Sequence, residues 1–349
     1  VRKTLVGATT SLNAVFTNLG LLEVHGGRLE HSNTVTNFNS TSRTLTGGRY
    51  HVRGEWLVPG SEVRTLAADM MLVGTGGAML SSASVDAMRN LQTVAAQGRL
   101  EVTGGRTLAL SNPLVNEGAV RVGLGGALST TQTYRQTTNT AATILEEGTL
   151  TAALGLDHQA GVLQGRGMVN AAITSTGVLD PIGRLEIHGA LTTLAGSRLE
   201  ARLSGTNLGA FDQLVVFGPV TLNAGLGLDV AFASNEGDRF ALVDVQGGAA
   251  LQGSFTGLAE GATVTIDGNV YQLSYVGGDG NDVVLSRNAP AQVRDLALSA
   301  ATILEGEVVR LTGALVDNDG SDDLTLIVDW GDGSIERYRP GRERFDIPH

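Results

Sequence analysis

The stretch GRLEVTGGR, residues 98–106, recurs along the chain in altered form. Residues 20–28 read GLLEVHGGR, residues 183–189 read GRLEIHG, and residues 118–123 read GAVRVG. Position 118 follows position 98 by 20 residues, and the copies at 20 and 98 lie 78 apart, close to four such steps. Short alternating strands repeated about every 20 residues are typical of proteins in which each unit packs on its neighbours. The repeat therefore predicts one coil of a parallel β-solenoid per step.

The same pattern predicts which side chains face the interior of each coil. Leu100 and Val102 point inward and Glu101 points to solvent, because successive side chains of a strand face opposite sides. Val120 and Val122 of the next coil then stack on Leu100 and Val102 at the spacing of neighbouring strands, about 4.8 Å. Since one coil cannot bury its apolar side alone, we expect stability to come from contacts between coils.

Patterning along the whole chain predicts an all-β fold in three parts. Alternating apolar and polar residues end at Gly, Asn or Asp, as strands and turns do. Only Leu80–Gln97 suggests a short helix or an irregular loop between strands. We expect a parallel right-handed β-solenoid (β-helix) over residues 1–200 and an aromatic-rich C-terminal cap over 201–288. The longer strands expected in the cap are residues 212–217, 226–232, 239–245 and 271–276.

A partial β-sandwich is expected over residues 289–349, after a linker at residues 287–291. Two strands are predicted between Thr302 and Leu315, and another runs from Leu324 to Trp330. The sequence GDGS at 331–334 predicts a tight turn. This part is shorter than a complete β-sandwich of about 100 residues.

Composition and charge exclude several classes of protein. The chain has no cysteine, which rules out disulfides and thiolate metal sites. Residues 1–200 carry a net charge of +1 and residues 201–349 a net charge of −12, a balance that argues against nucleic acid and anionic membranes as partners. No apolar stretch is long enough for a transmembrane helix. Because the sequence starts at Val1 without Met or an apolar leader, we expect it to be part of a longer chain.

Residues 1 to about 288 resemble the β-solenoid passenger regions of bacterial surface proteins, of the autotransporter and haemagglutinin-like adhesin type. The resemblance rests on short glycine-rich strands in a fixed order: LTGGRY (45–50), GVLQGRG (161–167), GVLDP (177–181), DQLVV (212–216) and GDGNDVVL (278–285). Such families usually carry GTLSPG where this chain has VLDPIG at 178–183, a mild departure.

Residues 291–349 resemble the first two thirds of a polycystic-kidney-disease-type (PKD-like), immunoglobulin-like β-sandwich. The most specific motif is DWGDGS at 329–334, and EGE at 305–307 and DNDG at 317–320 precede it. The resemblance implies a spacer or binding module on a larger extracellular chain.

Together the two resemblances imply a structural, adhesive segment of a large bacterial protein that is secreted or displayed on the outer surface. A rigid stalk of this kind would present loops or neighbouring modules to a host, matrix or glycan surface. The alternative is a carbohydrate-active β-helix enzyme of the polysaccharide lyase or hydrolase type, which needs clustered carboxylates or carboxylates beside a basic group.

The acidic residues of the first 200 positions favour the non-enzyme interpretation. The four aspartates lie at least 17 residues apart and share no obvious face: Asp69, Asp86, Asp157 and Asp180. Three glutamates occupy one repeat position and predict an outward ladder: Glu23, Glu101 and Glu186. We therefore predict no catalytic and no cofactor-binding residues.

Calcium is the ion that the sequence suggests, because hard oxygen ligands clustered on a turn are what Ca²⁺ prefers. The candidate ligands are Asp317, Asp319, Asp322, Asp329 and Asp332. A solvated acidic loop is the alternative. Residues 277–285 also fit one nonapeptide of a calcium-binding roll, but a single copy predicts an ordinary turn. Surface or corner positions are expected for the histidines: His25, His31, His51, His158, His188 and His349.

Overall fold

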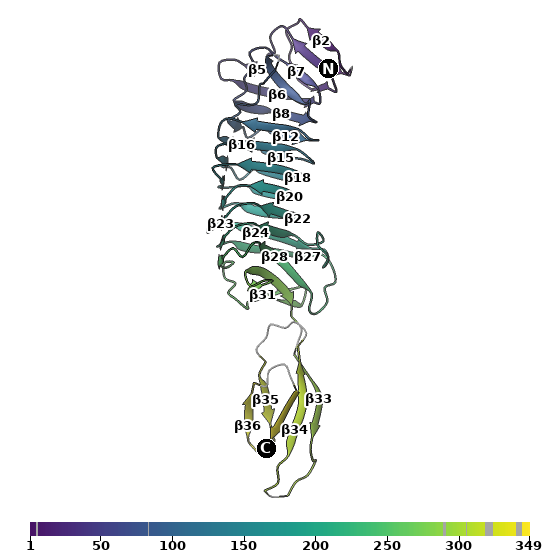
Figure 1. The fold of residues 1–349 in the computed structure, drawn as a ribbon, viewed down its shortest axis with the longest axis vertical. Helices are drawn as coiled ribbons and strands as arrows, with labels where there is room; N and C mark the ends of the chain where they lie inside the picture. Colours follow the sequence, from purple (N-terminus) through teal and green to yellow (C-terminus); the bar gives the residue numbers. More distant parts are fainter. Residues whose placement is uncertain (5, 83, 289–290, 305, 318–323, 340–343) are drawn as a thin grey trace. The chain divides into compact units, whose positions relative to one another are not determined.

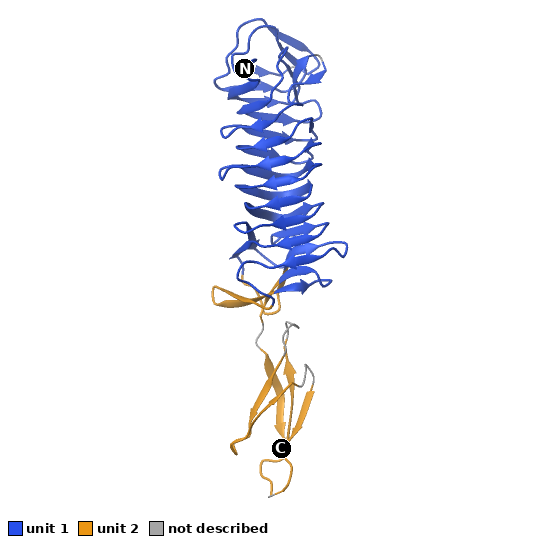
Figure 2. Ribbon diagram, turned by 90° about the vertical axis from the view of Figure 1, so that its left-hand side faces the viewer, with its two compact units in different colours: residues 1–232, 241–260, 274–284 blue, residues 233–240, 261–273, 285–349 orange. Residues whose placement is uncertain are grey.

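A computed structural model describes residues 1–349 except 5, 83, 289–290, 305, 318–323 and 340–343. All regular elements of the described residues are β-strands, so the expected all-β class is confirmed. None of these residues belongs to a helix that could cross a membrane. The chain divides into unit 1, residues 1–232, 241–260 and 274–284, and unit 2, residues 233–240, 261–273 and 285–349 (Figure 2).

Most of unit 1 belongs to a 27-stranded, mainly parallel sheet whose strands form three columns. The first column contains β1 (Arg2–Lys3), β3 (Leu21–Val24), β6 (Thr44–Val52), β8 (Thr65–Val73), β12 (Arg99–Thr103), β15 (Ala119–Val122), the first halves of β18 (Ala142–Ala152), β20 (Val162–Asn170) and β22 (Val178–Ile187), then β24 (Arg198–Leu203) and β27 (Gly225–Val230). In Figure 1 these strands lie one beyond another in chain order.

The other two columns are built in the same way. The second contains β13 (Thr107–Leu110), β16 (Ala127–Thr130), the second halves of β18, β20 and β22, then β25 (Gln213–Val216) and β28 (Arg239–Val245). The third contains the beginnings of β6 and β8, then β11 (Thr93–Val94), β14 (Leu114–Asn116), β17 (Tyr134–Gln136), β19 (Leu156–His158), β21 (Ile173–Ser175), β23 (Leu191–Thr193), β26 (Val220–Leu222) and β29 (Leu251–Gly253).

The remaining strands of the chain form smaller arrangements. A five-stranded sheet near the N-terminus contains β2 (Thr9–Leu12), β4 (Arg28–His31), β7 (Glu55–Leu57), β9 (Ala78–Ser82) and β10 (Val85–Asp86). Antiparallel pairing joins β5 (Phe38–Asn39) to β6, and β30 (Thr263–Ile266) to β31 (Asn269–Gly277), which precedes β32 (Asp282–Arg287). Unit 2 adds β33 (Gln292–Leu298), β34 (Arg310–Val316), β35 (Leu326–Asp329), β36 (Ile335–Tyr338) and β37 (Arg344–Pro348).

The predicted stacking of neighbouring strands is confirmed in register. Leu100 lies opposite Val120 and Val102 opposite Val122, and all four side chains are fully buried. Their column continues through neighbouring strands as Leu22, Tyr50, Met70, Leu100, Val120, Thr143, Leu163, Leu179 and Leu199. Since each of these side chains is at most 1% exposed, the strands share one interior. This arrangement is consistent with a β-solenoid-like fold.

The spacing between the first two repeat copies is different from the prediction. Leu21 pairs with Arg49, Arg49 with Asp69, and Asp69 with Arg99, so three strand-to-strand steps separate the copies rather than four. The first and last of these steps are long, and each contains an additional short antiparallel strand, β5 against β6 and β10 against β9. The short-helix alternative for Leu80–Gln97 is therefore wrong, since its described residues form strands and turns.

A buried polar column occupies one corner of unit 1, at the ends of the third-column strands. Its members are at most 1% exposed: Asn116, Gln136, His158, Ser175 and Thr193. Gln136 Nε2 donates to the carbonyl of Ala160 at 2.9 Å, and Asn116 Nδ2 donates to that of Ala142 at 3.0 Å. Because turns leave carbonyls without strand partners, these side chains satisfy buried backbone that would otherwise be costly.

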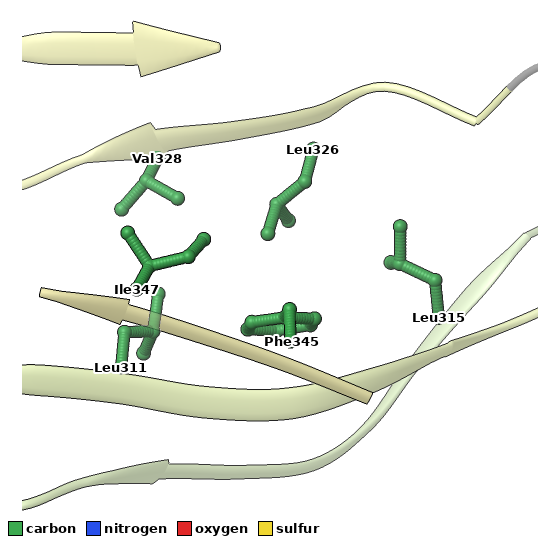
Figure 3. Close-up of a cluster of buried hydrophobic side chains, with 6 residues drawn as sticks. All are labelled: Leu311, Leu315, Leu326, Val328, Phe345 and Ile347. Atoms are coloured by element: carbon green, nitrogen blue, oxygen red, sulfur yellow. The ribbon is translucent and has the colours of Figure 1, made fainter. Parts of the chain in front are cut away.

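Unit 2 contains a separate apolar core between its two small sheets (Figure 3). The antiparallel sheet β33–β34–β37 and the hairpin β35–β36 contribute Leu311, Leu315, Leu326, Val328, Phe345 and Ile347. The predicted strand within 324–330 is confirmed as β35. Two strands were predicted between Thr302 and Leu315, and the described residues of this range contain one, β34, which pairs with β33 and β37.

Candidate functional site

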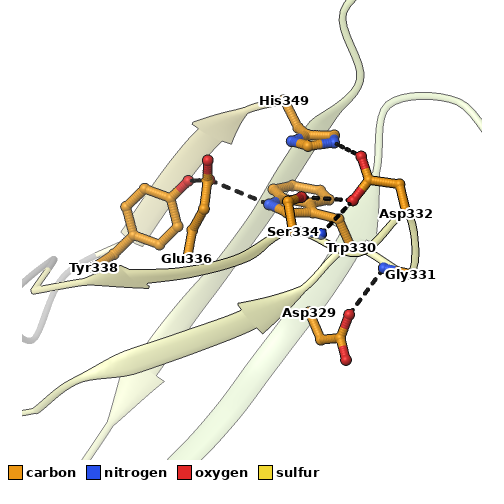
Figure 4. Close-up of polar contacts among 8 residues, drawn as sticks. All are labelled: Asp329, Trp330, Gly331, Asp332, Ser334, Glu336, Tyr338 and His349. Carbon is orange, nitrogen blue, oxygen red and sulfur yellow. Dashed lines mark hydrogen bonds and ion pairs between the residues drawn. The ribbon is translucent and has the colours of Figure 1, made fainter.

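The acidic turn between β35 and β36 contains two of the five predicted calcium ligands, Asp329 and Asp332 (Figure 4). Asp329 lies opposite Ile335 in the antiparallel register, and the Trp330 N–H donates to the carbonyl of Ser334 at 3.1 Å. The tight turn predicted from GDGS is therefore confirmed.

Both carboxylates of this turn accept hydrogen bonds from neighbouring groups. The Gly331 N–H donates to Asp329 Oδ1 at 2.9 Å. The Ser334 N–H and hydroxyl donate to Asp332 Oδ1 at 2.8 and 2.6 Å, and His349 Nε2 lies 3.0 Å from Asp332 Oδ2 (Figure 4). The hydrogen bonds from Ser334, with a smaller effect of His349, lower the pKa of Asp332 to about 2.

Aromatic groups extend this polar network along β36. The His349 ring stacks on Trp330 with centroids 4.4 Å apart and planes 10° apart. Trp330 Nε1 donates to Glu336 at 3.2 Å, and the Tyr338 hydroxyl donates to the same carboxylate. The Tyr338 and Trp330 hydrogen bonds lower the pKa of Glu336. The turn thus forms a network whose members mainly bind one another.

The chemistry of a nucleophilic triad is not available to Ser334, Asp332 and His349. In a Ser–His–Asp triad the imidazole lies between the hydroxyl and the carboxylate, so that it can accept the hydroxyl proton. Here the Asp332 carboxylate lies between the other two groups. The Ser334 hydroxyl already donates its proton to Asp332, and the low pKa of Asp332 keeps this carboxylate ionised.

The remaining predicted ligands do not complete a metal site within the described residues. Asp319 and Asp322 lie outside them, and Asp317 follows the end of β34. Across the described ranges, no group of three or more His, Cys, Asp or Glu side chains is arranged to hold a metal ion. Calcium binding by the acidic loop stays a prediction.

Calorimetric titration of the chelator-treated chain with calcium chloride tests that prediction. Binding should produce heat and raise the melting temperature, because an ion bound by the folded state alone stabilises it. The double variant D319N/D322N should lose both signals. The control D346N, which removes a carboxylate paired with Arg310, should keep them. Absence of heat and of a melting shift in the unsubstituted chain would leave only the solvated-loop interpretation.

A second acidic cluster, which sequence analysis did not identify, lies beside β22 in unit 1. Leu179 pairs with Leu199, and the residues that follow them, Asp180 and Glu200, are close enough for the charge of Glu200 to act on Asp180. Asp212 approaches from the segment before β25, where its two carboxylate oxygens accept the N–H groups of Gly183 at 2.7 Å and Arg202 at 2.8 Å. Asp180 thus has two acidic neighbours, Glu200 and, from beyond the first 200 residues, Asp212.

The environment of Asp180 favours its neutral form. Burial raises the pKa of Asp180, and the charges of Asp212 and Glu200 raise it further. Glu200 forms an ion pair with Arg198, whereas the Asp180 carboxyl makes no hydrogen bond or ion pair within the described part of the chain. The pKa of Asp180 therefore lies above that of an exposed aspartate.

The predicted glutamate ladder holds for two of its three members. Glu23 and Glu101 both lie on the first column, and their carboxylates meet Arg2 at 2.6 Å and Arg121 at 3.7 Å. Glu186 instead lies on the second column, between Met168 and Val215. The prediction was wrong for Glu186 because its repeat copy occupies the second half of a longer strand.

Two of the histidines are buried rather than exposed. His31 is 0% exposed and accepts the Trp56 Nε1–H at 2.9 Å, so the expected surface position is wrong. His158 occupies a corner, as expected, but is 1% exposed, and its Nδ1 lies 3.0 Å from Ser175 Oγ. Burial lowers the pKa of both imidazoles, and that of His158 to about 4. His25 and His188 are exposed.

Two open hollows lie on the surface of unit 1. One of about 340 Å³ is lined by Met168 and by two ion pairs, Glu147–Arg166 at 2.8 Å and Arg184–Glu186 at 3.0 Å. The other, of about 560 Å³, is lined by glycines with His25, Arg28, Arg53 and Glu55. Both offer hydrogen-bond donors and acceptors side by side at the surface.

Comparisons with known proteins do not assign the chain to a family. No known protein family matches it, and no curated protein is significantly similar to it. What is established is a large all-β protein with a long, mainly parallel sheet and small antiparallel sheets.

Proposed function

We propose that this chain is a structural, adhesive segment of an extracellular bacterial surface protein, secreted or displayed on the outer surface. In this proposal unit 1 is a right-handed β-solenoid stalk of the autotransporter type, and the residues from 291 onward form part of a PKD-like sandwich. Its partners are a host, matrix or glycan surface. The observation that carries the proposal is the in-register parallel pairing repeated from β1 to β29.

Continuous pairing suits a mechanical role for a physical reason. Each strand of a column hydrogen-bonds to the strand before and after it, so local bending must strain several ladders together. Buried aromatic side chains near the end of unit 1 support the predicted cap. Phe255 is fully buried, and the Tyr275 hydroxyl bridges the Phe255 N–H at 2.9 Å and the Leu258 carbonyl at 2.6 Å.

Binding of the purified 349-residue chain to cultured animal cells, matrix proteins and a glycan array tests the adhesive role. Saturable binding by the folded chain, and none by the heat-unfolded chain, is the expected result. Uniform absence of binding would contradict adhesion and leave a spacer role.

The carbohydrate-active enzyme remains the second candidate, and the Asp180 cluster is the observation that favours it. Carboxylates with raised pKa values are what general acid catalysis requires. A screen against polyuronates separates the two functions, because a lyase releases unsaturated products that an adhesin does not.

A further inference from the structure

We propose that the Asp180–Pro181 peptide bond is a self-cleavage site, at which the Asp180 carboxyl attacks its own backbone carbonyl carbon. The chain contains a single Asp–Pro sequence, and it lies within β22 beside the acidic cluster described above. Three features of this position support the inference: the acidic surroundings of the Asp180 carboxyl, the prolyl nitrogen as leaving group, and the unpaired backbone around the bond.

The first feature is that Asp180 has no partner that would hold it ionised. Glu200 and Asp212 face it from β24 and from the segment before β25, and Gln164 lies opposite it on β20. The nearby cations are engaged elsewhere, since Arg198 pairs with Glu200 and Arg202 lies 3.6 Å from Asp229. A proton on Asp180 therefore relieves repulsion among three acids, and the neutral carboxyl is the reactive form.

The second feature is the residue that follows. Pro181 supplies a tertiary amide, whose nitrogen carries no N–H and becomes a secondary amine when the bond breaks. Such an amide also has a weaker preference for trans over cis than an ordinary peptide bond. The prolyl nitrogen is therefore a better proton acceptor and leaving group than the nitrogen of any other residue at this position.

The third feature is the backbone around the bond. β22 pairs with β24 at Val178 and Leu179, and it pairs with β25 from Arg184 onward. Between these two stretches Ile182 is 55% exposed and Gly183 has a positive φ of 77°. The bond thus lies beside a bend that is unpaired on one side, between the half-buried Asp180 and the buried Pro181, and the exposed Ile182 follows directly.

The proposed reaction is balanced as a hydrolysis. A carboxyl oxygen of Asp180 forms a bond to its own carbonyl carbon, the bond from that carbon to the Pro181 nitrogen breaks, and the carboxyl proton moves to this nitrogen. The products are a chain beginning at Pro181 and a five-membered cyclic anhydride on Asp180. One water molecule then opens the anhydride and leaves two carboxyl groups. No cofactor or oxidant is needed.

Incubation of the 349-residue chain between pH 4 and pH 7, followed by intact mass spectrometry, tests the proposal. Fragments 1–180 and 181–349 should accumulate as the pH falls, and water labelled with oxygen-18 should add one label to fragment 1–180. D180N keeps the size of the side chain without its acid and should lose the products. P181A should slow their formation. The matched control D157N, an aspartate not followed by proline, should cleave like the unsubstituted chain.

Two further comparisons separate the proposal from ordinary acid lability of Asp–Pro bonds. The folded chain should cleave at a higher pH than the same chain in urea, because only folding places Glu200 and Asp212 beside Asp180. E200Q should move the pH dependence of the folded chain downward, with folding checked by circular dichroism. Absence of fragments, cleavage of D180N at the unsubstituted rate, or equal pH dependence in the folded and unfolded chains would each overturn the proposal.

Discussion

Gly165→Ala is expected to destabilise unit 1 by about 3 kcal/mol or more, the size of effect that severe overpacking produces. Gly165 lies on β20 directly opposite Leu145 of β18, with a φ of 106°. A Cβ atom added there would overlap the Leu145 carbonyl oxygen. β18 cannot move away from β20 without breaking its own pairing with β15 and β16. The clash therefore cannot be relieved by a local shift of one strand.

Gly196→Ala is the matched control for that effect. Gly196 also has a positive φ, 97°, but a Cβ atom there meets nothing within 4 Å. It should cost about 1 kcal/mol, the ordinary penalty for a side chain in this backbone conformation. Urea unfolding followed by circular dichroism measures both variants. Equal losses would mean that close approach of the strands is not what requires glycine at 165.

The stability of unit 1 should fall by about 3 kcal/mol between pH 6.5 and pH 4 because of His158 alone. Burial lowers the pKa of this imidazole in the folded chain to about 4, from 6.5 when unfolded. Below pH 6.5 the unfolded chain therefore binds a proton that the folded chain excludes. The contribution is fully present above pH 6.5, is lost as the pH falls, and levels off below about pH 4.

His158→Gln should flatten this part of the pH dependence. Glutamine already occupies the equivalent position of the neighbouring strand at Gln136, and its amide can donate to the Gly161 carbonyl, which His158 Nε2 now approaches at 3.2 Å. The control His188→Gln replaces an exposed imidazole and should retain the loss of stability that His158 causes. Urea unfolding at each pH gives the comparison, and identical slopes for all three chains would contradict the account of His158.

Local alternation was predictable from the sequence because it follows from strand geometry. Leu100 and Val102 face inward with their partners Val120 and Val122. Side chains alternate between the two faces of a strand, so the face that carries the apolar residues is the one that becomes buried. The number of steps between repeats was not predictable in the same way. An additional antiparallel strand such as β10 lengthens one step without altering which residues stack.

The candidate sites depended on contacts that no local pattern specifies. Asp180 meets Asp212 because two strands from different steps adjoin, and His31 is buried because Trp56, 25 residues later, donates to its ring. Glu186 and Glu101 share the motif Gly-Arg-Leu-Glu but lie on different columns. The motif describes a strand that begins after a turn, and strands of both columns begin in this way. By contrast, the turn at Asp329–Ser334 was predictable, because Asp and Gly at fixed positions specify it locally.

Disulfide cross-linking tests the parallel stacking of strands most directly. The chain contains no cysteine, so the two introduced thiols can pair only with each other within one molecule. Ser129 lies opposite Thr151, and Thr151 lies opposite Asn170. Neighbouring strands are about 4.8 Å apart, within the reach of a disulfide, whereas two strand spacings are beyond it. On mild oxidation S129C/T151C should form an intramolecular disulfide, seen by intact mass and by a shift on a non-reducing gel, and S129C/N170C should not. Cross-linking of S129C/N170C, or none in S129C/T151C, would contradict the in-register parallel stack.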